Sequence, residues 1–155
     1  PVNIYREFAS KLFESRNKHV ADEVIDEVWQ LYEGRTWFVQ MMMNELFALT
    51  QEGGTCLPPM VDEARHNVIL TQEQGYKDLL SNLPPRQKVV LQAIAKEGRA
   101  RSITSAKFIK KYNLNSASSV QAAVKLLLKN DLLTQTDDCY QVYDFFLAEW
   151  LATVF

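Results

Sequence analysis

The feature that most constrains this chain is the order of short segments between residues 83 and 143. Leu83-Pro84-Pro85 precedes an amphipathic run that ends at Gly98, and a second short run covers 102–112. A third amphipathic run continues to Leu133, and alternating residues 140–143 follow a polar tip at Asp137-Asp138. Proline and glycine bound helices, and period-two alternation indicates a strand. Three short helices followed by a β-hairpin predict a winged helix-turn-helix.

The residues that fill and cap these helices can be named. Ser105 is expected to cap the second helix, and Ser116 or Ser118 the third. A final helix is expected over 145–155. The spacing of the apolar residues predicts that each of the three helices buries one face. The residues expected on these buried faces are Val89, Val90, Ile94, Phe108, Ile109, Val120, Val124, Leu127 and Leu128.

The first 82 residues predict a helical bundle. Helices are expected over about 21–33 and 37–51, with Thr36 as the N-cap of the second of these. A further helix follows Asp62-Glu63 and is bent or interrupted at Gly75. The run 37–51 is apolar nearly all round, which predicts a central position. The chain is therefore expected to be mainly α, with a bundle at 1–82 and a winged helix at 83–155.

Bulk composition excludes several classes of protein. The chain is 47% hydrophobic and 23% charged, which argues against disorder. It has no membrane-length apolar run, and no signal peptide is expected from its first residues. Cys56 and Cys139 are expected to stay reduced, which favours a cytoplasmic location. Because the chain begins at Pro1 rather than Met, we expect it to be a piece of a longer protein.

Charge divides the chain into two parts of opposite sign. Residues 81–130 contain ten Lys and Arg residues and a single acid, Glu97. The first half carries an acidic group, Asp22, Glu23, Asp26, Glu27 and Glu33. We interpret the pairs at 22–23 and 26–27 as a solvated helix face. Opposite charge in the two halves suggests two functional units.

The third helix of the second half is the candidate recognition helix. In a helix-turn-helix, outward side chains of this helix contact base edges and phosphates. The candidate DNA-binding residues, including three lysines of the preceding helix, are Lys107, Lys110, Lys111, Ser118, Ser119, Gln121, Lys125 and Lys129. Arginine, the commonest specific base contact, is absent from this face. A lysine face on a winged helix that contacts protein has the same pattern, so duplex DNA and a protein partner both stay open.

No catalytic or metal site is predicted. His19 and His66 have no Cys or His three or four residues away, and Met41-Met42-Met43 cannot converge on one ligand from a helix. The sequence contains no G-x-x-x-x-G-K-[ST] phosphate loop. This region is therefore not expected to be an enzyme by itself or to hold a cofactor.

A candidate anion site precedes the helix at 37–51. Gly34 and Arg35 come immediately before its N-terminus, where backbone N–H groups favour anions. The alternative is structural: Gly34 ends one helix and Trp37 anchors the next in the core. From the residues alone the structural alternative is favoured.

The whole pattern resembles the C-terminal part of the archaeal-type P-loop ATPases, a branch of the STAND and AAA+ group also abundant in Bacteroides-like bacteria. The matching residues are Tyr5, Phe8, Phe13, the run 34–40, Leu83, Gln87, Leu91, 93–95, Ser105, Phe108, Tyr112, 116–120, Leu127, Leu132, Tyr140, Val142, Asp144, Phe146, Trp150 and Leu151. In that family a nucleotide-binding core is followed by a helical lid and a winged helix.

The resemblance implies a non-catalytic fragment whose lid senses nucleotide and whose winged helix contacts DNA or a protein. ATP or ADP with Mg would be held by an upstream P-loop domain. The lid helix of the STAND group begins with Gly-x-Pro near the adenine, and Thr36 stands where that proline would be. The resemblance thus implies a nucleotide-adjacent, cofactor-binding role for Gly34, Arg35, Thr36 and Trp37, in the longer protein only.

Two other hypotheses stay open. The chain could be a stand-alone winged-helix transcriptional regulator with a helical effector or dimerisation domain. It could instead be a structural interaction module in which the apolar end 145–155 forms a dimer surface, so a homo-oligomer is left open.

Overall fold

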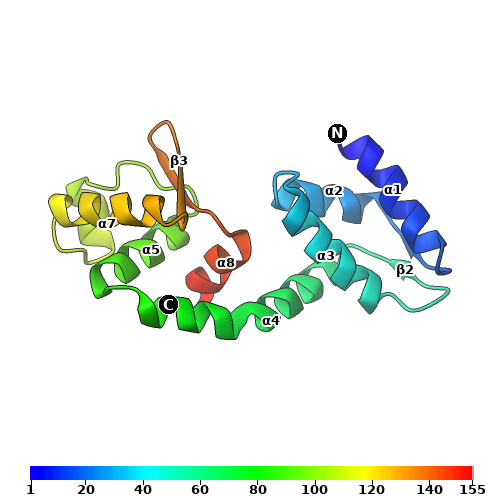
Figure 1. Cartoon of the computed structure of the whole chain (residues 1–155). Coiled ribbons are helices and arrows are strands. Elements are labelled where there is room, and N and C mark those ends of the chain that lie inside the picture. Colours follow the sequence, from blue (N-terminus) through cyan, green and yellow to red (C-terminus); the bar gives the residue numbers. More distant parts are fainter. Residues whose placement is uncertain (155) are drawn as a thin grey trace. The chain divides into compact units, whose positions relative to one another are not determined.

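The computed structural model describes residues 1–154 and divides into two compact units, Pro1–Thr71 and Gln72–Phe155, with Phe155 outside the described residues (Figure 1). The first unit contains α1 (Val2–Glu14), β1 (His19–Val20), α2 (Asp22–Leu31), α3 (Thr36–Leu49), β2 (Thr55–Cys56) and the start of α4 (Met60–Asn82). The second contains the end of α4 and then α5 (Pro85–Glu97), α6 (Ala106–Lys111), α7 (Ala117–Lys129), β3 (Leu133–Thr136), β4 (Cys139–Val142) and α8 (Phe145–Val154).

The first unit is a small helical bundle with one strand pair. β1 and β2 run parallel, with His19 opposite Thr55 and Val20 opposite Cys56. Two-residue strands are too short to show alternation, so the sequence did not predict them. The core is formed mainly by side chains of α2 and α3, with Phe13 of α1 and Val61 and Ala64 of α4 also buried. The α2 and α3 residues are Val24, Ile25, Val28, Phe38, Val39, Met42, Met43 and Leu46.

The α3 helix differs in two ways from its prediction. It begins at Thr36, and Arg35 takes the N-cap position, so the predicted cap at Thr36 is wrong. Trp37 is 51% exposed, so the helix is not buried on all sides. Met42 and Met43 are buried while Met41 is half-buried, which agrees with core filling by consecutive residues that point in different directions.

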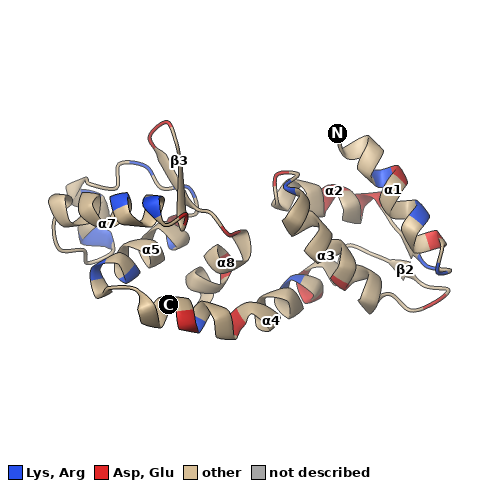
Figure 2. Ribbon diagram, in the orientation of Figure 1, with Lys and Arg blue, Asp and Glu red and all other residues tan. Residues whose placement is uncertain are grey.

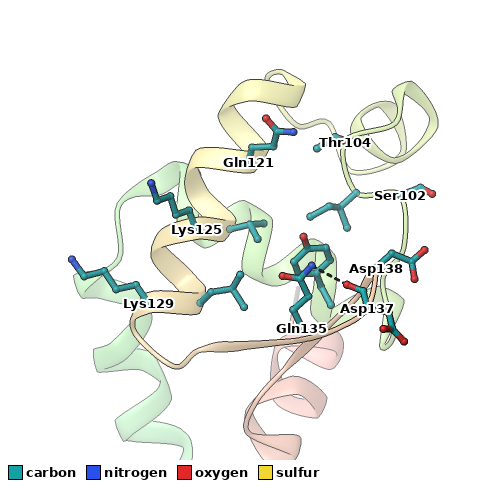
Figure 3. Close-up of a pocket in the computed structure, with 12 residues that line it drawn as sticks. Ser102, Thr104, Gln121, Lys125, Lys129, Gln135, Asp137 and Asp138 are labelled. Atoms are coloured by element: carbon teal, nitrogen blue, oxygen red, sulfur yellow. Dashed lines mark hydrogen bonds between the residues drawn. The ribbon is translucent and has the colours of Figure 1, made fainter.

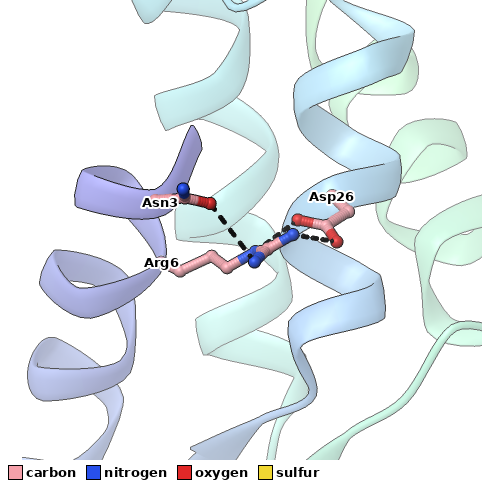
Figure 4. A network of polar contacts seen from close by, with 3 residues as sticks. All are labelled: Asn3, Arg6 and Asp26. Carbon is pink, nitrogen blue, oxygen red and sulfur yellow. Dashed lines mark hydrogen bonds and ion pairs between the residues drawn. The ribbon is translucent and has the colours of Figure 1, made fainter. Parts of the chain in front are cut away.

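A bidentate ion pair joins α1 to α2 (Figure 4). Nε of Arg6 donates to Oδ1 of Asp26, and Nη2 donates to Oδ2, both at 2.6 Å. Nη1 of Arg6 also donates to Oδ1 of Asn3 at 3.4 Å. The hydrogen bond to Asp26 raises the pKa of Arg6. Asp26 therefore has a directed contact, because the guanidinium fork matches a carboxylate, and its interpretation as part of a merely solvated face is wrong.

The division between the units falls inside α4, whereas the sequence placed it at Leu83. The helix continues without interruption through Gly75, which is exposed. Tyr76 and Leu80, in the part of α4 that belongs to the second unit, are buried. Pro84 and Pro85 therefore separate two helices of that unit, since Pro85 supplies the first residue of α5.

The second unit has the predicted order of three helices followed by a two-stranded antiparallel wing. Leu133 pairs with Val142 at the base of the wing, and Thr136 pairs with Cys139 at its tip. The backbone N–H groups of Ala100 and Tyr140 donate to each other's carbonyls at 2.8 Å, which holds the loop after α5 against β4. The predicted mainly-α fold, a helical bundle followed by a winged helix-turn-helix, is confirmed.

The core of the second unit lies between α5, α7 and α8. It is built from apolar side chains that include Val90, Leu91, Ile94, Val120, Val124, Leu127, Phe146 and Leu151. Val89 is 43% exposed, so its predicted inward position is wrong. In α8 the side chains of Leu147 and Trp150 are buried as well, so they cannot supply the dimer surface that was left open for 145–155, of which Phe155 lies outside the described residues.

Candidate functional site

A groove of about 750 Å³ lies between α7 and the wing (Figure 3). The loop at 102–104 contributes to its lining. Its apolar lining consists of Ile103, Val124, Leu128 and the ring of Tyr140. Its polar lining includes Gln121, Lys125 and Lys129 from α7 and Gln135, Asp137 and Asp138 from the wing. An apolar surface with polar groups on both sides is the usual composition of a binding site.

The N-terminus of α7 fixes which side chains reach this groove. Ser116 is the N-cap, since its Oγ accepts from the N–H of Ser119 at 3.1 Å. The Oγ of Ser118 lies 3.2 Å from that of Ser116. The structure therefore decides between the two predicted caps in favour of Ser116. It places Ser118 and Ser119 at the cap, outside the groove lining, whereas Gln121, Lys125 and Lys129 line the groove.

The predicted lysines of α6 occupy a different surface. Lys107 and Lys110 are exposed. Nζ of Lys111 donates to Oε1 of Glu97 at 2.7 Å, and the same oxygen accepts from the Tyr112 hydroxyl at 2.6 Å. These hydrogen bonds lower the pKa of Glu97 and raise that of Lys111. The charge of Lys111 is thus locally compensated, which sequence reasoning missed because the two residues are far apart in the chain.

A second, smaller cavity of about 350 Å³ lies beside α6. Lys107, Lys111 and Glu97 line it together with Arg101. Arg101 also forms an ion pair with Asp138 of the wing. Two of the three basic residues at this cavity are therefore matched by carboxylates.

The wing is acidic, and its part in the groove was not predicted. Residues 131–155 contain five acids and no Lys or Arg. Asp137 and Asp138 form the wing tip, on the opposite side of the groove from Lys125 and Lys129 (Figure 3). Figure 2 shows the tip of the wing in red and basic positions on α7 in blue. The sequence did contain a signal for this: within the winged helix, the basic residues lie before residue 131 and the acids lie mostly after it. The comparison of the two halves of the chain did not show this change of sign.

The segment at 34–37 is a tight turn between α2 and α3. Gly34 has φ +66°, and its N–H donates to the carbonyl of Trp29 at 2.9 Å. A Cβ at Gly34 would lie 2.8 Å from the Trp29 indole. Arg35 forms an ion pair with Glu33 at 3.8 Å. Gly34 therefore lies in the turn that follows α2, directly after Glu33 at φ +53°, whereas Trp37 is exposed beside Phe38, so its predicted position as a core anchor is wrong.

Two observations limit the chemistry of the described residues. Among residues 1–154 no group of three His, Cys, Asp or Glu side chains could hold a metal ion. Over the same residues, every helix is too short or too polar to cross a membrane. Cys56 is buried, and burial raises the pKa of its thiol.

Comparison with known proteins identifies the second unit. The family model described as "Probable winged helix domain" matches residues 74–153. Among solved structures, a Walker-type ATPase of Pyrococcus abyssi is similar, with a TM-score of 0.67 and 21% identity. The similarity covers 94% of this chain and 40% of the ATPase chain, so this chain spans less than half the length of that protein. No curated protein matches the sequence.

Proposed function

We propose that this chain, which belongs to the family of probable winged helix domains, is the non-catalytic C-terminal part of a P-loop ATPase. The supporting observation is the similarity to a Walker-type ATPase across both units rather than across the winged helix alone. In this proposal the first unit is a lid beside a nucleotide held by an upstream P-loop domain. The winged helix is the output surface, and it contacts duplex DNA or a protein partner.

The mechanism that we propose couples nucleotide state to that output surface. The lid closes over ATP or ADP with Mg in the upstream domain, and the winged helix changes its exposure as the lid moves. A ligand can shift such an equilibrium only by the difference in its affinity for the two states. The distinct effects of ATP and ADP would therefore arise from contacts that the lid makes with one nucleotide and not with the other.

Hydrogen exchange of the longer protein, including the upstream domain, tests this coupling. Exchange should be measured with ATP, with ADP and without nucleotide. We expect the amides of α7 and the wing to change protection between these states. Identical protection of the winged helix in all three states would contradict the proposal.

The turn before α3 is the nucleotide-adjacent part of the lid in this proposal. The exposed indole of Trp37, the guanidinium of Arg35 and the N–H groups at the start of α3 lie close together in the chain and support an adjacent role. In the longer protein, nucleotide should slow exchange at Gly34, Arg35, Thr36 and Trp37. Equal exchange there with and without nucleotide would place the turn away from the nucleotide.

A stand-alone transcriptional regulator is the second candidate function. The exposed lysines of α6 and α7 favour it, because phosphate contacts are made by Lys and Arg. The reading frame upstream of the chain distinguishes the two: a phosphate loop supports the ATPase and a nearby start codon supports the regulator. Binding to duplex DNA should weaken steeply with salt, and replacing Lys107, Lys110, Lys111 and Lys125 with Glu should abolish it.

A further inference from the structure

We infer that the groove between α7 and the wing binds a protein segment. This segment has apolar side chains in its centre, acidic residues along one edge and basic residues along the other. The inference rests on the proposed function, because it names the partner of the same output surface. The site is unusual in its distribution of charge. One side carries two ammonium groups and the other carries two carboxylates, with an apolar strip between them.

The apolar strip supplies the part of the site that excludes water. Val124 and Leu128 are four residues apart on α7, so both lie on the helix face that borders the groove. Val124, like Ile103, is buried and forms its floor, whereas Leu128 and Tyr140 are half-buried and offer the accessible apolar surface. Ile103 and the ring of Tyr140 line the groove from the loop and from β4. The reciprocal backbone hydrogen bonds between Ala100 and Tyr140 hold that loop and β4 together. A partner's apolar side chains would find a surface fixed in place by secondary structure.

The two charged sides give the groove a direction. Lys125 and Lys129 are one helical turn apart and exposed, so they form a basic edge. Asp137 and Asp138 at the exposed tip of the wing form the acidic edge, although Arg101 is paired with Asp138 and offsets part of its charge. The carbonyl of Asp137 accepts from Nε2 of Gln135 at 2.9 Å, which restrains the tip. Complementary charges at the rim of an interface select the partner and its orientation more than they add affinity.

Duplex DNA does not match this distribution of charge. A duplex presents phosphates on both edges of each groove, so a ligand seated between α7 and the wing would place phosphate near both sides of the site. Attraction by Lys125 and Lys129 would be opposed by repulsion from Asp137, whereas the charge of Asp138 is largely compensated by its ion pair with Arg101. A segment that carries both signs of charge meets no such repulsion.

The test begins with a peptide selected on the whole chain. A phage-displayed library of short random peptides is panned against it, and the best peptide is resynthesised with a fluorescent label for anisotropy at physiological salt. We expect it to carry acids and bases on either side of apolar residues. K125E/K129E and D137N/D138N should each weaken binding roughly three- to tenfold, since exposed charge pairs contribute modestly. Asparagine suits position 137, where φ is +55°.

The matched control is K88E/K96E, which makes the same change in charge on α5, at residues outside the groove lining. This control should leave peptide affinity unchanged. A second experiment uses a variant in which the charges of both edges of the groove are reversed. A peptide whose acids and bases are exchanged should bind that variant again. Circular dichroism confirms that each variant is folded. Recovery of no peptide, or of peptides that the groove variants bind as well as the wild type does, would overturn the inference.

The same variants separate a protein partner from DNA. If a labelled short duplex binds the groove, the D137N/D138N variant should bind it more tightly, because the substitution removes repulsion of phosphate and frees Arg101 from its ion pair. The same variant should bind the peptide more weakly. A stronger duplex complex with this variant would overturn the inference in favour of DNA. Failure here leaves the nucleotide response of the longer protein untouched, so it is distinguishable from failure of the proposed function.

Discussion

The hydroxyl of Tyr76 in α4 donates a hydrogen bond to Oδ2 of Asp144, at 3.4 Å, immediately before α8. Oδ1 of the same carboxylate accepts from the N–H groups of Phe146 and Leu147, at 2.9 and 3.1 Å, and so caps α8. Trp150 of α8 lies against Tyr76 with ring centroids 5.6 Å apart. These contacts explain why the end of α4 belongs to the winged-helix unit.

Replacing Asp144 should destabilise that unit. Asp144→Ala removes the cap of α8 and the acceptor of the Tyr76 hydroxyl, and we expect a loss of about 1–3 kcal/mol in the free energy of unfolding. Asp144→Asn keeps an oxygen acceptor and should cost less. Urea unfolding of both variants measures the difference. Equal losses for Ala and Asn would show that the hydrogen bonds of Oδ1 contribute little.

The Asp144 carboxyl should also make stability depend on pH. Burial raises its pKa above the ordinary value of 3.8, and the N–H groups of Leu147 and Phe146 oppose that change only in part. The folded state therefore holds this proton more tightly than the unfolded state. Its contribution is fully present below about pH 4 and is lost as pH rises through the raised pKa. The advantage of wild type over Asp144→Asn should thus shrink from acidic to neutral pH in urea unfolding, and an advantage that grows with pH would contradict this sign.

Replacing Gly34 or Gly75 with alanine should change the free energy of unfolding in opposite directions. Gly34→Ala places a Cβ 2.8 Å from the Trp29 indole at a positive φ, so it should destabilise the first unit by more than about 1 kcal/mol. Gly75→Ala adds a methyl group with nothing within 4 Å in α4, and it should stabilise by roughly 0.5–1 kcal/mol. Thermal unfolding of both variants measures this contrast. Similar effects of the two substitutions would refute the strain at Gly34.

Ser116 and Ser118 should differ as caps of α7. Ser116→Ala removes the acceptor of the Ser119 N–H and should cost about 1 kcal/mol. Ser118→Ala leaves that hydrogen bond in place and should change the free energy of unfolding by no more than roughly 0.5 kcal/mol. Chemical unfolding of the two single variants gives the comparison. A larger loss at Ser118 would mean that the cap lies there.

Lys111 should contribute less than its neighbours to weak, non-specific binding of duplex DNA at low salt. Its ammonium group is 2.7 Å from the Glu97 carboxylate, so little charge is left for a phosphate. Lys111→Ala should reduce affinity less than Lys107→Ala or Lys110→Ala, and Glu97→Gln should increase it. Fluorescence anisotropy with a labelled duplex measures the order. The prediction fails if Lys111→Ala has the largest effect, or if no variant changes affinity.

Local signals predicted much of the fold and less of the candidate site. Pro84, Gly98 and Ser105 mark the ends of helices through their own backbone and side-chain chemistry, so their roles could be predicted from the sequence around them. The position of Val89 and the pairing of Lys111 with Glu97 were not, because each depends on how one helix is rotated against another. The groove likewise requires residues from α7, the loop after α5 and the wing to meet.

The sequence by itself determined the order of helices and wing and the separation of charge along the chain, since capping, periodicity and composition act over a few residues. Only the tertiary structure decided that the end of α4 joins the winged helix through Tyr76 and Asp144. It also decided that Asp137 and Asp138 stand across a groove from Lys125 and Lys129. Both results depend on how separate helices and strands pack against one another, which signals acting over a few residues do not set.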